Sequence, residues 1–104
     1  MDPVTEKIVV KIEADMAELI PPFIENRHAD IAAMREALPK GDYAFIQRTG
    51  HGMKGAGAGF GFGAVTEIGA AIEQAAKDKN DKDIQKGIEE LAGYMRRLEV
   101  VYEA

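Results

Sequence analysis

The segment RTGHGMKGAGAGFG, residues 48–61, is the most unusual stretch of this chain of 104 residues. Seven of the eleven glycines of the protein lie between positions 50 and 63. Each glycine inside a helix costs about 1 kcal/mol relative to alanine. The apolar residues here, Met53 and Phe60 among them, nevertheless recur at helical spacing, and Asp42 can cap such a helix. We therefore expect a helix whose glycines serve another purpose.

A projection at about 100° per residue gives these glycines two roles. With Met53 at the centre of the buried face, Gly50 and Gly57 fall within about 60° of it and allow a neighbouring helix to approach closely. His51 falls about 160° from Met53 and therefore points to solvent. Gly55 lies on the same outer face, one turn further on, and leaves the imidazole uncovered.

Outward from this segment the sequence predicts three further helices. On the N-terminal side, Pro21-Pro22 suits a first helical turn, and an apolar stripe then runs to about Leu38. On the C-terminal side, one helix runs from about Val65 to Ala76. A last helix begins at a cap, Asp81 or Asp83. Its apolar stripe comprises Ile84, Ile88, Leu91, Met95, Leu98 and Tyr102.

The predicted fold class is all-α, an up-and-down antiparallel four-helix bundle, because roughly three to six residues connect the helices. The whole chain, 1–104, is expected to form this single domain. The β-branched residues between Ile8 and Ile12 predict an extended lead-in or a weak helix. Asp15 and Glu18 have capping-box spacing, which predicts a short helix near the N-terminus.

The composition narrows the functional classes. A net charge of −5 argues against nucleic acid as the main partner. The absence of cysteine excludes disulfides and thiolate zinc sites. We expect no metal site shared by His28 and His51, because no acidic residue is near His51 in the sequence. With no export signal and no apolar run long enough to span a membrane, a soluble, cytoplasmic monomer is expected.

The glycine spacing also matches, by letter, the dinucleotide-binding pattern Gly50-x-Gly52-x-x-Gly55. That pattern requires a preceding strand, a βαβ unit and an acidic residue about 20 positions further on. Glu73 is close to the last of these positions, but an all-helical chain supplies no sheet. We therefore reject nucleotide binding.

The charge around His51 points to a different ligand. Between Tyr43 and Thr66 there is no acidic residue, and the charged side chains are Arg48 and Lys54. This local charge would stabilise a phosphoryl group and complement an acidic docking partner. A neutral imidazole is also a nitrogen nucleophile.

Residues His51 to Gly61 resemble the acceptor motif of histidine-containing phosphotransfer (HPt) domains. That motif reads His, any residue, a hydrophobic residue, Lys, Gly, two small residues, two variable ones, an apolar residue and Gly. The resemblance implies that His51 is the phosphoacceptor through Nε2, that Lys54 steadies the phosphoryl oxygens and that Gly55 keeps the site open. Ala56 and Gly57 depart from the family pattern, in which serine is frequent at these positions.

The resemblance further implies a phosphorelay intermediate in two-component signal transduction. Such a chain accepts a phosphoryl group from a receiver-domain aspartate and passes it to another receiver, as a phosphocarrier and co-substrate rather than an enzyme. The expected partners are response-regulator receiver domains and a hybrid histidine kinase. No cofactor is expected, since magnesium would come with the receiver. The alternatives are a module that binds a receiver or kinase without carrying phosphate and, less favoured, a purely structural bundle.

Overall fold

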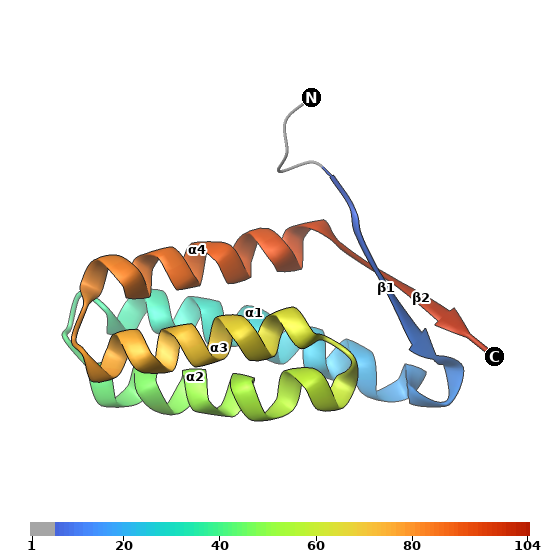
Figure 1. The fold of residues 1–104 in the computed structure, drawn as a ribbon, viewed down its shortest axis with the longest axis horizontal. Coiled ribbons are helices and arrows are strands. Elements are labelled where there is room, and N and C mark those ends of the chain that lie inside the picture. The colour runs from blue at the N-terminus through green and yellow to red at the C-terminus, as the bar shows by residue number, and fades with distance from the viewer. Residues whose placement is uncertain (1–5) are drawn as a thin grey trace.

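The computed structural model describes residues 6–104, which fold mostly into helices, as predicted (Figure 1). The four helices are α1 (Ile20–Ala37), α2 (Tyr43–Gly57), α3 (Gly63–Lys77) and α4 (Asp81–Arg97). Two strands, β1 (Ile8–Glu13) and β2 (Leu98–Glu103), precede and follow them. Two 3₁₀ segments, η2 (Ala14–Leu19) and η3 (Ala58–Phe60), lead into α1 and out of α2.

The four helices pack around one hydrophobic core. In Figure 1 the α1–α2 and α3–α4 connections lie at one end of the bundle, and the α2–α3 connection lies at the other. Fully buried side chains come from every helix: Ile20 and Met34 of α1, Ile46 and Met53 of α2, Val65 and Ile72 of α3, and Ile84, Ile88 and Leu91 of α4. Within the described residues, no helix is both long enough and apolar enough to cross a membrane.

The start of α2 is capped as predicted. An Asp42 carboxylate oxygen accepts a hydrogen bond from the backbone N–H of Phe45 at 3.2 Å. The cap of α4 was predicted one residue or more too late. Asn80 takes this position with extended backbone, and its side-chain oxygen accepts from the N–H of Asp83 at 3.1 Å. Asp81 and Asp83 instead lie in the first turn of α4, where their negative charges interact favourably with the helix dipole.

The N-terminal part combines two correct predictions with one error. The extended lead-in is confirmed as β1, and Pro21-Pro22 lies in the first turn of α1 as predicted. The predicted cap at Asp15 is wrong. The segment η2 begins one residue earlier, no side chain caps it, and it runs directly into α1.

The predicted last helix is too long, because α4 ends at Arg97 and the chain continues as β2. Leu98 already has extended backbone, with φ −66° and ψ 131°. β2 pairs in parallel with β1, placing Ile8 opposite Leu98 and Ile12 opposite Tyr102. Residues four apart share a face of a helix and also a face of a strand, so their spacing does not distinguish the two.

Candidate functional site

Helices α2 and α3 are in backbone contact at three glycines, Gly50 and Gly57 of α2 and Gly69 of α3. A Cβ atom added to Gly50 would lie 2.8 Å from both the Gly69 carbonyl oxygen and the Glu73 amide nitrogen. A Cβ added to Gly69 would lie 2.7 Å from the Gly50 oxygen and from the Lys54 nitrogen. Both distances are shorter than real Cβ contacts, so only glycine fits. A Cβ added to Gly57 would lie 2.6 Å from the Thr66 amide nitrogen, so the predicted close packing is confirmed at both Gly50 and Gly57.

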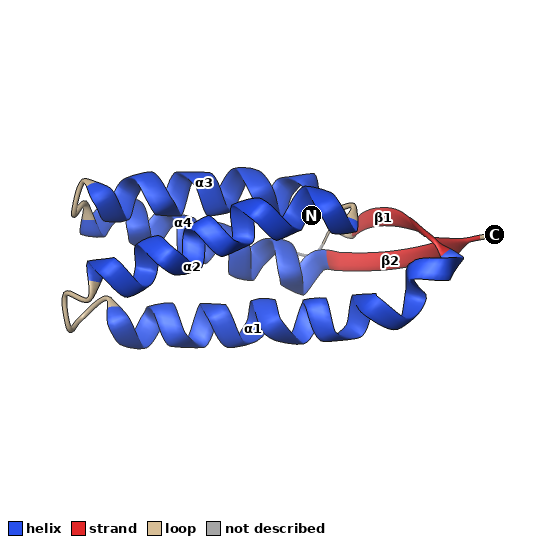
Figure 2. Ribbon diagram, turned by 90° about the horizontal axis from the view of Figure 1, so that it is seen from below, coloured by secondary structure: helices blue, strands red, loops and turns tan. Residues whose placement is uncertain are grey.

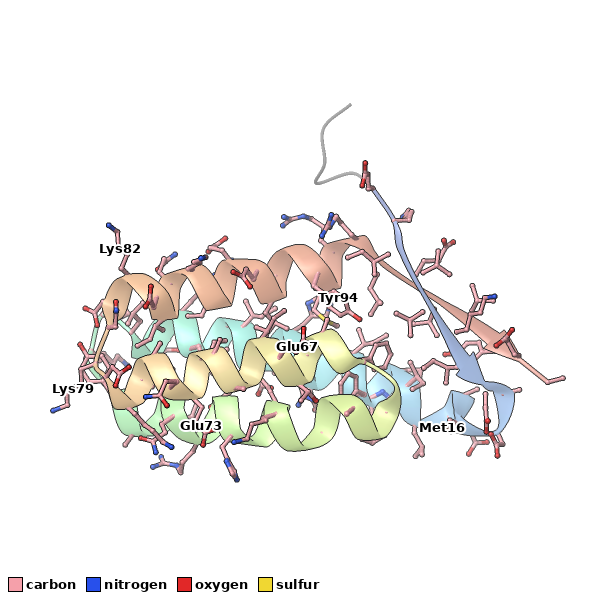
Figure 3. All side chains as sticks on the ribbon, in the orientation of Figure 1. Met16, Glu67, Glu73, Lys79, Lys82 and Tyr94 are labelled. Atoms are coloured by element: carbon pink, nitrogen blue, oxygen red, sulfur yellow. The ribbon has the colours of Figure 1, made fainter. Side chains whose placement is uncertain are left out.

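This close approach brings a carboxylate of α3 against two side chains of α2. Glu73 Oε2 lies 2.9 Å from His51 Nδ1, and Glu73 Oε1 lies 2.8 Å from Lys54 Nζ. In Figure 3, Glu73 lies on α3 at its border with α2. One carboxylate thus joins the histidine and the lysine that the sequence places one turn apart on α2.

Exposure differs sharply within this group. The Glu73 side chain is only 10% exposed, Lys54 is 42% exposed and His51 is 69% exposed. The solvent exposure predicted for His51 is therefore confirmed. An ionised carboxylate can only accept hydrogen bonds, so His51 Nδ1–H donates to Glu73. That tautomer leaves Nε2 with a free lone pair.

The electrostatics of the group support an ionised Glu73. The hydrogen bond from Lys54 lowers the pKa of Glu73 below its ordinary value. Partial burial acts in the opposite direction, and the hydrogen bond with His51 lowers the pKa further. Glu73 therefore carries its negative charge throughout the physiological pH range. The Lys54–Glu73 ion pair and the charged acceptor of the His51 hydrogen bond are kept above this depressed pKa and are lost as the pH falls through it.

The surface around His51 is open on the side of the glycines. Nothing outside the helix backbone lies within 4 Å of a Cβ built on Gly52, Gly55 or Gly59. Gly55 therefore leaves open space one turn beyond the histidine. Arg48 is exposed one turn before it, and no ion pair of Arg48 occurs in the part of the chain that is described.

A threonine of α3 fixes the last turn of α2. The Thr66 hydroxyl donates to the Lys54 carbonyl oxygen at 2.9 Å and accepts from the Ala58 N–H at 2.7 Å. The hydroxyl thus links backbone groups on both sides of Gly57, where α2 ends. This anchor holds the turn that carries Lys54 against α3.

The sequence missed Glu73 as a site residue, and the expected absence of acids around His51 is wrong. Glu73 is separated from Gly50-His51 by more than 20 residues, so inspection of neighbouring residues could not find it. One signal was present. Glu73 follows Gly69 by one helical turn, on the face that Gly69 presents to α2. His28 is exposed on α1 and is not part of this group.

Comparison with known proteins identifies the family. No curated protein and no solved structure matches the chain. The family model described as Hpt domain matches residues 18–100, which include all four helices. Among the described residues, no three His, Cys, Asp or Glu side chains are arranged to hold a metal ion. Because the Hpt domain model matches residues 18–100, the chain belongs to the Hpt domain family, the histidine phosphotransfer modules of two-component signalling.

Proposed function

We propose that His51 is the phosphoacceptor of this module and that the chain relays a phosphoryl group from one receiver domain to another. The observation that carries this proposal is the exposed His51 ring held by Glu73 through Nδ1, with Nε2 free. Membership of the Hpt family supports a phosphocarrier, rather than a catalyst, with receiver domains as partners. The alternating connections in Figure 1 support the up-and-down antiparallel order expected for the bundle.

The proposed transfer requires no separate base. The Nε2 lone pair attacks the phosphorus of a receiver aspartyl phosphate, the N–P bond forms, and the bond from phosphorus to the aspartate oxygen breaks. The aspartate leaves as a carboxylate. Because Nδ1 keeps its proton, the ring becomes positively charged, and Glu73 stabilises that charge across the 2.9 Å contact. The reverse reaction loads the second receiver.

The two cations of α2 have separate parts in this proposal. Lys54 is bound to Glu73 but remains 42% exposed, and its ammonium has three donors. Lys54 can therefore donate hydrogen bonds to Glu73 and to a phosphoryl oxygen at the same time. Arg48, exposed one turn before His51, contributes charge to the docking surface. The roles proposed for Lys54 and Arg48 involve no cofactor held by this chain. The magnesium ion of the transfer would be supplied by the receiver.

The proposal is tested by incubating the chain with a phosphorylated receiver domain. We expect an acid-labile, base-stable label on the chain, located at His51 by peptide mapping. If the chain binds the receiver but acquires no label, the binding-module alternative is correct. Binding without label would leave the fold and the family membership unaffected.

Replacement of Gly55 by Gln is expected to slow transfer strongly without unfolding the domain. The new side chain would overhang the imidazole from one turn away, where the structure shows open space. The measurement is a transfer time course together with the thermal unfolding temperature. Gly59→Gln is the matched control, since Gly59 is equally open but two turns from His51. Equal rates for both variants and the unmodified chain would contradict the need for an open face.

Replacement of Lys54 by Ala is expected to slow transfer by roughly tenfold, which corresponds to about 1.4 kcal/mol. The reason is the loss of a charge-assisted contact to the phosphoryl group and to Glu73. Salt screens such contacts, so the effect should be larger at low ionic strength. Arg48→Ala should have a smaller and more salt-dependent effect. Time courses at two salt concentrations measure both, and a Lys54→Ala rate equal to that of the unmodified chain would exclude a role for Lys54.

A further inference from the structure

The parallel strands β1 and β2 form a two-stranded sheet that extends beyond the ends of the helices (Figure 2). Each strand pairs on one side only, so both outer edges present unpaired backbone groups. Two strands alone are marginally stable in water, and a larger sheet is normally required. The monomer expected from the sequence would leave these edges unpaired.

The strands also carry most of the large hydrophobic side chains that are exposed in the described residues. Four large hydrophobic side chains are exposed in the described residues, and three of them lie on this pair: Val9 at 54%, Val101 at 41% and Tyr102 at 43%. β1 alternates in burial as a half-buried strand does, with Ile8, Val10 and Ile12 on the inner face and the exposed Val9 and Lys11 between them. β1 contains no proline to prevent pairing with another strand.

The edge of β1 is the more accessible of the two. In Figure 2, the labelled part of β1 lies on the side of β2 that faces away from α1, and β1 then runs directly into η2. Over its labelled part, the outer edge of β1 faces away from α1, in a part of the view that lies beyond the end of α3. A strand from another molecule can therefore be added at β1.

We propose that β1 pairs antiparallel with β1 of a second copy of this chain, about a two-fold axis at Val10. The result is a four-stranded sheet in which the two β1 strands are central. This register sets Ile8 opposite Ile12 of the second copy, both on the inner face. It also sets Lys7, which directly precedes β1, opposite Glu13 of the second copy, and symmetry makes each of these contacts twice.

Neighbouring registers are disfavoured by charge. An axis at Val9 would set Lys7 opposite Lys11, and an axis at Lys11 would set that lysine opposite itself. A shift by one residue would set inner residues opposite outer ones. The charges therefore select the register at Val10 among the β1 pairings.

This dimer leaves the histidine face free. Glu73 lies towards the end of α3 that is distant from the strands (Figure 3). Since the two β1 strands run in opposite directions, the two bundles project to opposite ends of the shared sheet. The proposal does not depend on the phosphoacceptor role of His51, and a monomeric chain could still carry phosphate.

Sedimentation equilibrium between about 1 μM and about 1 mM chain tests the proposal. We expect reversible dimers, weakened on the order of tenfold by Lys7→Glu and also by Glu13→Lys, because each change sets like charges opposite twice. The double variant Lys7→Glu with Glu13→Lys should restore the affinity. Lys82→Glu is the control, since this exposed lysine lies at the far end of the bundle in Figure 3. A monomer at all concentrations, or a double variant as weak as the single ones, would overturn the proposal.

Cysteine cross-linking distinguishes the two edges, because the chain has no cysteine of its own. Val10→Cys should form a disulfide-linked dimer under mild oxidation, since residues at the two-fold axis have neighbouring Cβ atoms. Val100, the register partner of Val10 on β2, is the matched control. Three strand spacings would separate the two copies of Val100 by about 14 Å, too far for a disulfide. Cross-linking of Val100→Cys alone would assign the interface to β2 and refute this proposal.

Discussion

His51→Gln is expected to leave no phosphoryl label on the chain after incubation with a phosphorylated receiver domain. Glutamine has no nitrogen lone pair that can attack phosphorus, because its amide nitrogen is conjugated with the carbonyl group. The fold should be unaffected, since the His51 side chain is 69% exposed on the outer face of α2. The loss of label is therefore a loss of chemistry rather than of structure.

The measurement is radiolabel or intact mass after transfer, with circular dichroism to verify the fold. His28→Gln is the matched control, because His28 is also exposed and lies on α1, away from Glu73. This control should acquire label at the normal rate. Persistent label on His51→Gln would refute the acceptor assignment. A His51→Gln variant that loses label but keeps its full regulatory effect on the receiver would identify a binding module instead.

Gly50→Ala is expected to lower the free energy of unfolding by about 2 kcal/mol. Its methyl group would lie 2.8 Å from two backbone atoms of α3, and backbone can yield only if the helices separate. The better helix propensity of alanine, about 1 kcal/mol, offsets part of this cost. This loss is large compared with the free energy of unfolding of a whole domain, which is typically about 5–15 kcal/mol.

Gly52→Ala provides the matched control two residues along the same helix. A Cβ at this position meets nothing within 4 Å, so only the gain in propensity remains. The control should therefore be more stable than the unmodified chain by up to about 1 kcal/mol. Urea denaturation measures both variants as shifts of the transition midpoint. A Gly50→Ala variant as stable as Gly52→Ala would contradict the close contact between α2 and α3.

The features that the sequence predicts correctly are those that depend on a single helix, such as which residues face inward. Periodicity within α2 places Gly50 inward and His51 outward, and both positions are confirmed. The contact with Glu73 depends on a second helix and on the distance between the two axes. Gly69 allows the close approach from the other helix, and no pattern within α2 identifies Gly69 or the carboxylate one turn beyond it.

The C-terminal strand shows a different limit. Leu98 and Tyr102 continue the apolar stripe of α4 in spacing, yet they belong to β2. What decides between helix and strand there is the hydrogen-bonding partner β1, about 90 residues earlier in the chain. The β-branched residues of β1 indicated an extended segment or a weak helix, of which the first is correct, but they did not identify the partner strand.

The glycine contact between α2 and α3 also makes the position of the His51 ring depend on how closely these two helices pack. Glutamate has a short reach, so the 2.9 Å contact with His51 exists only while the two helix axes stay close. The position of the His51 ring is thus determined by the spacing of the two helix backbones, not by the freedom of surface side chains. Any substitution that swells the core between these helices, however distant from His51, should release the ring and slow transfer before it measurably unfolds the domain.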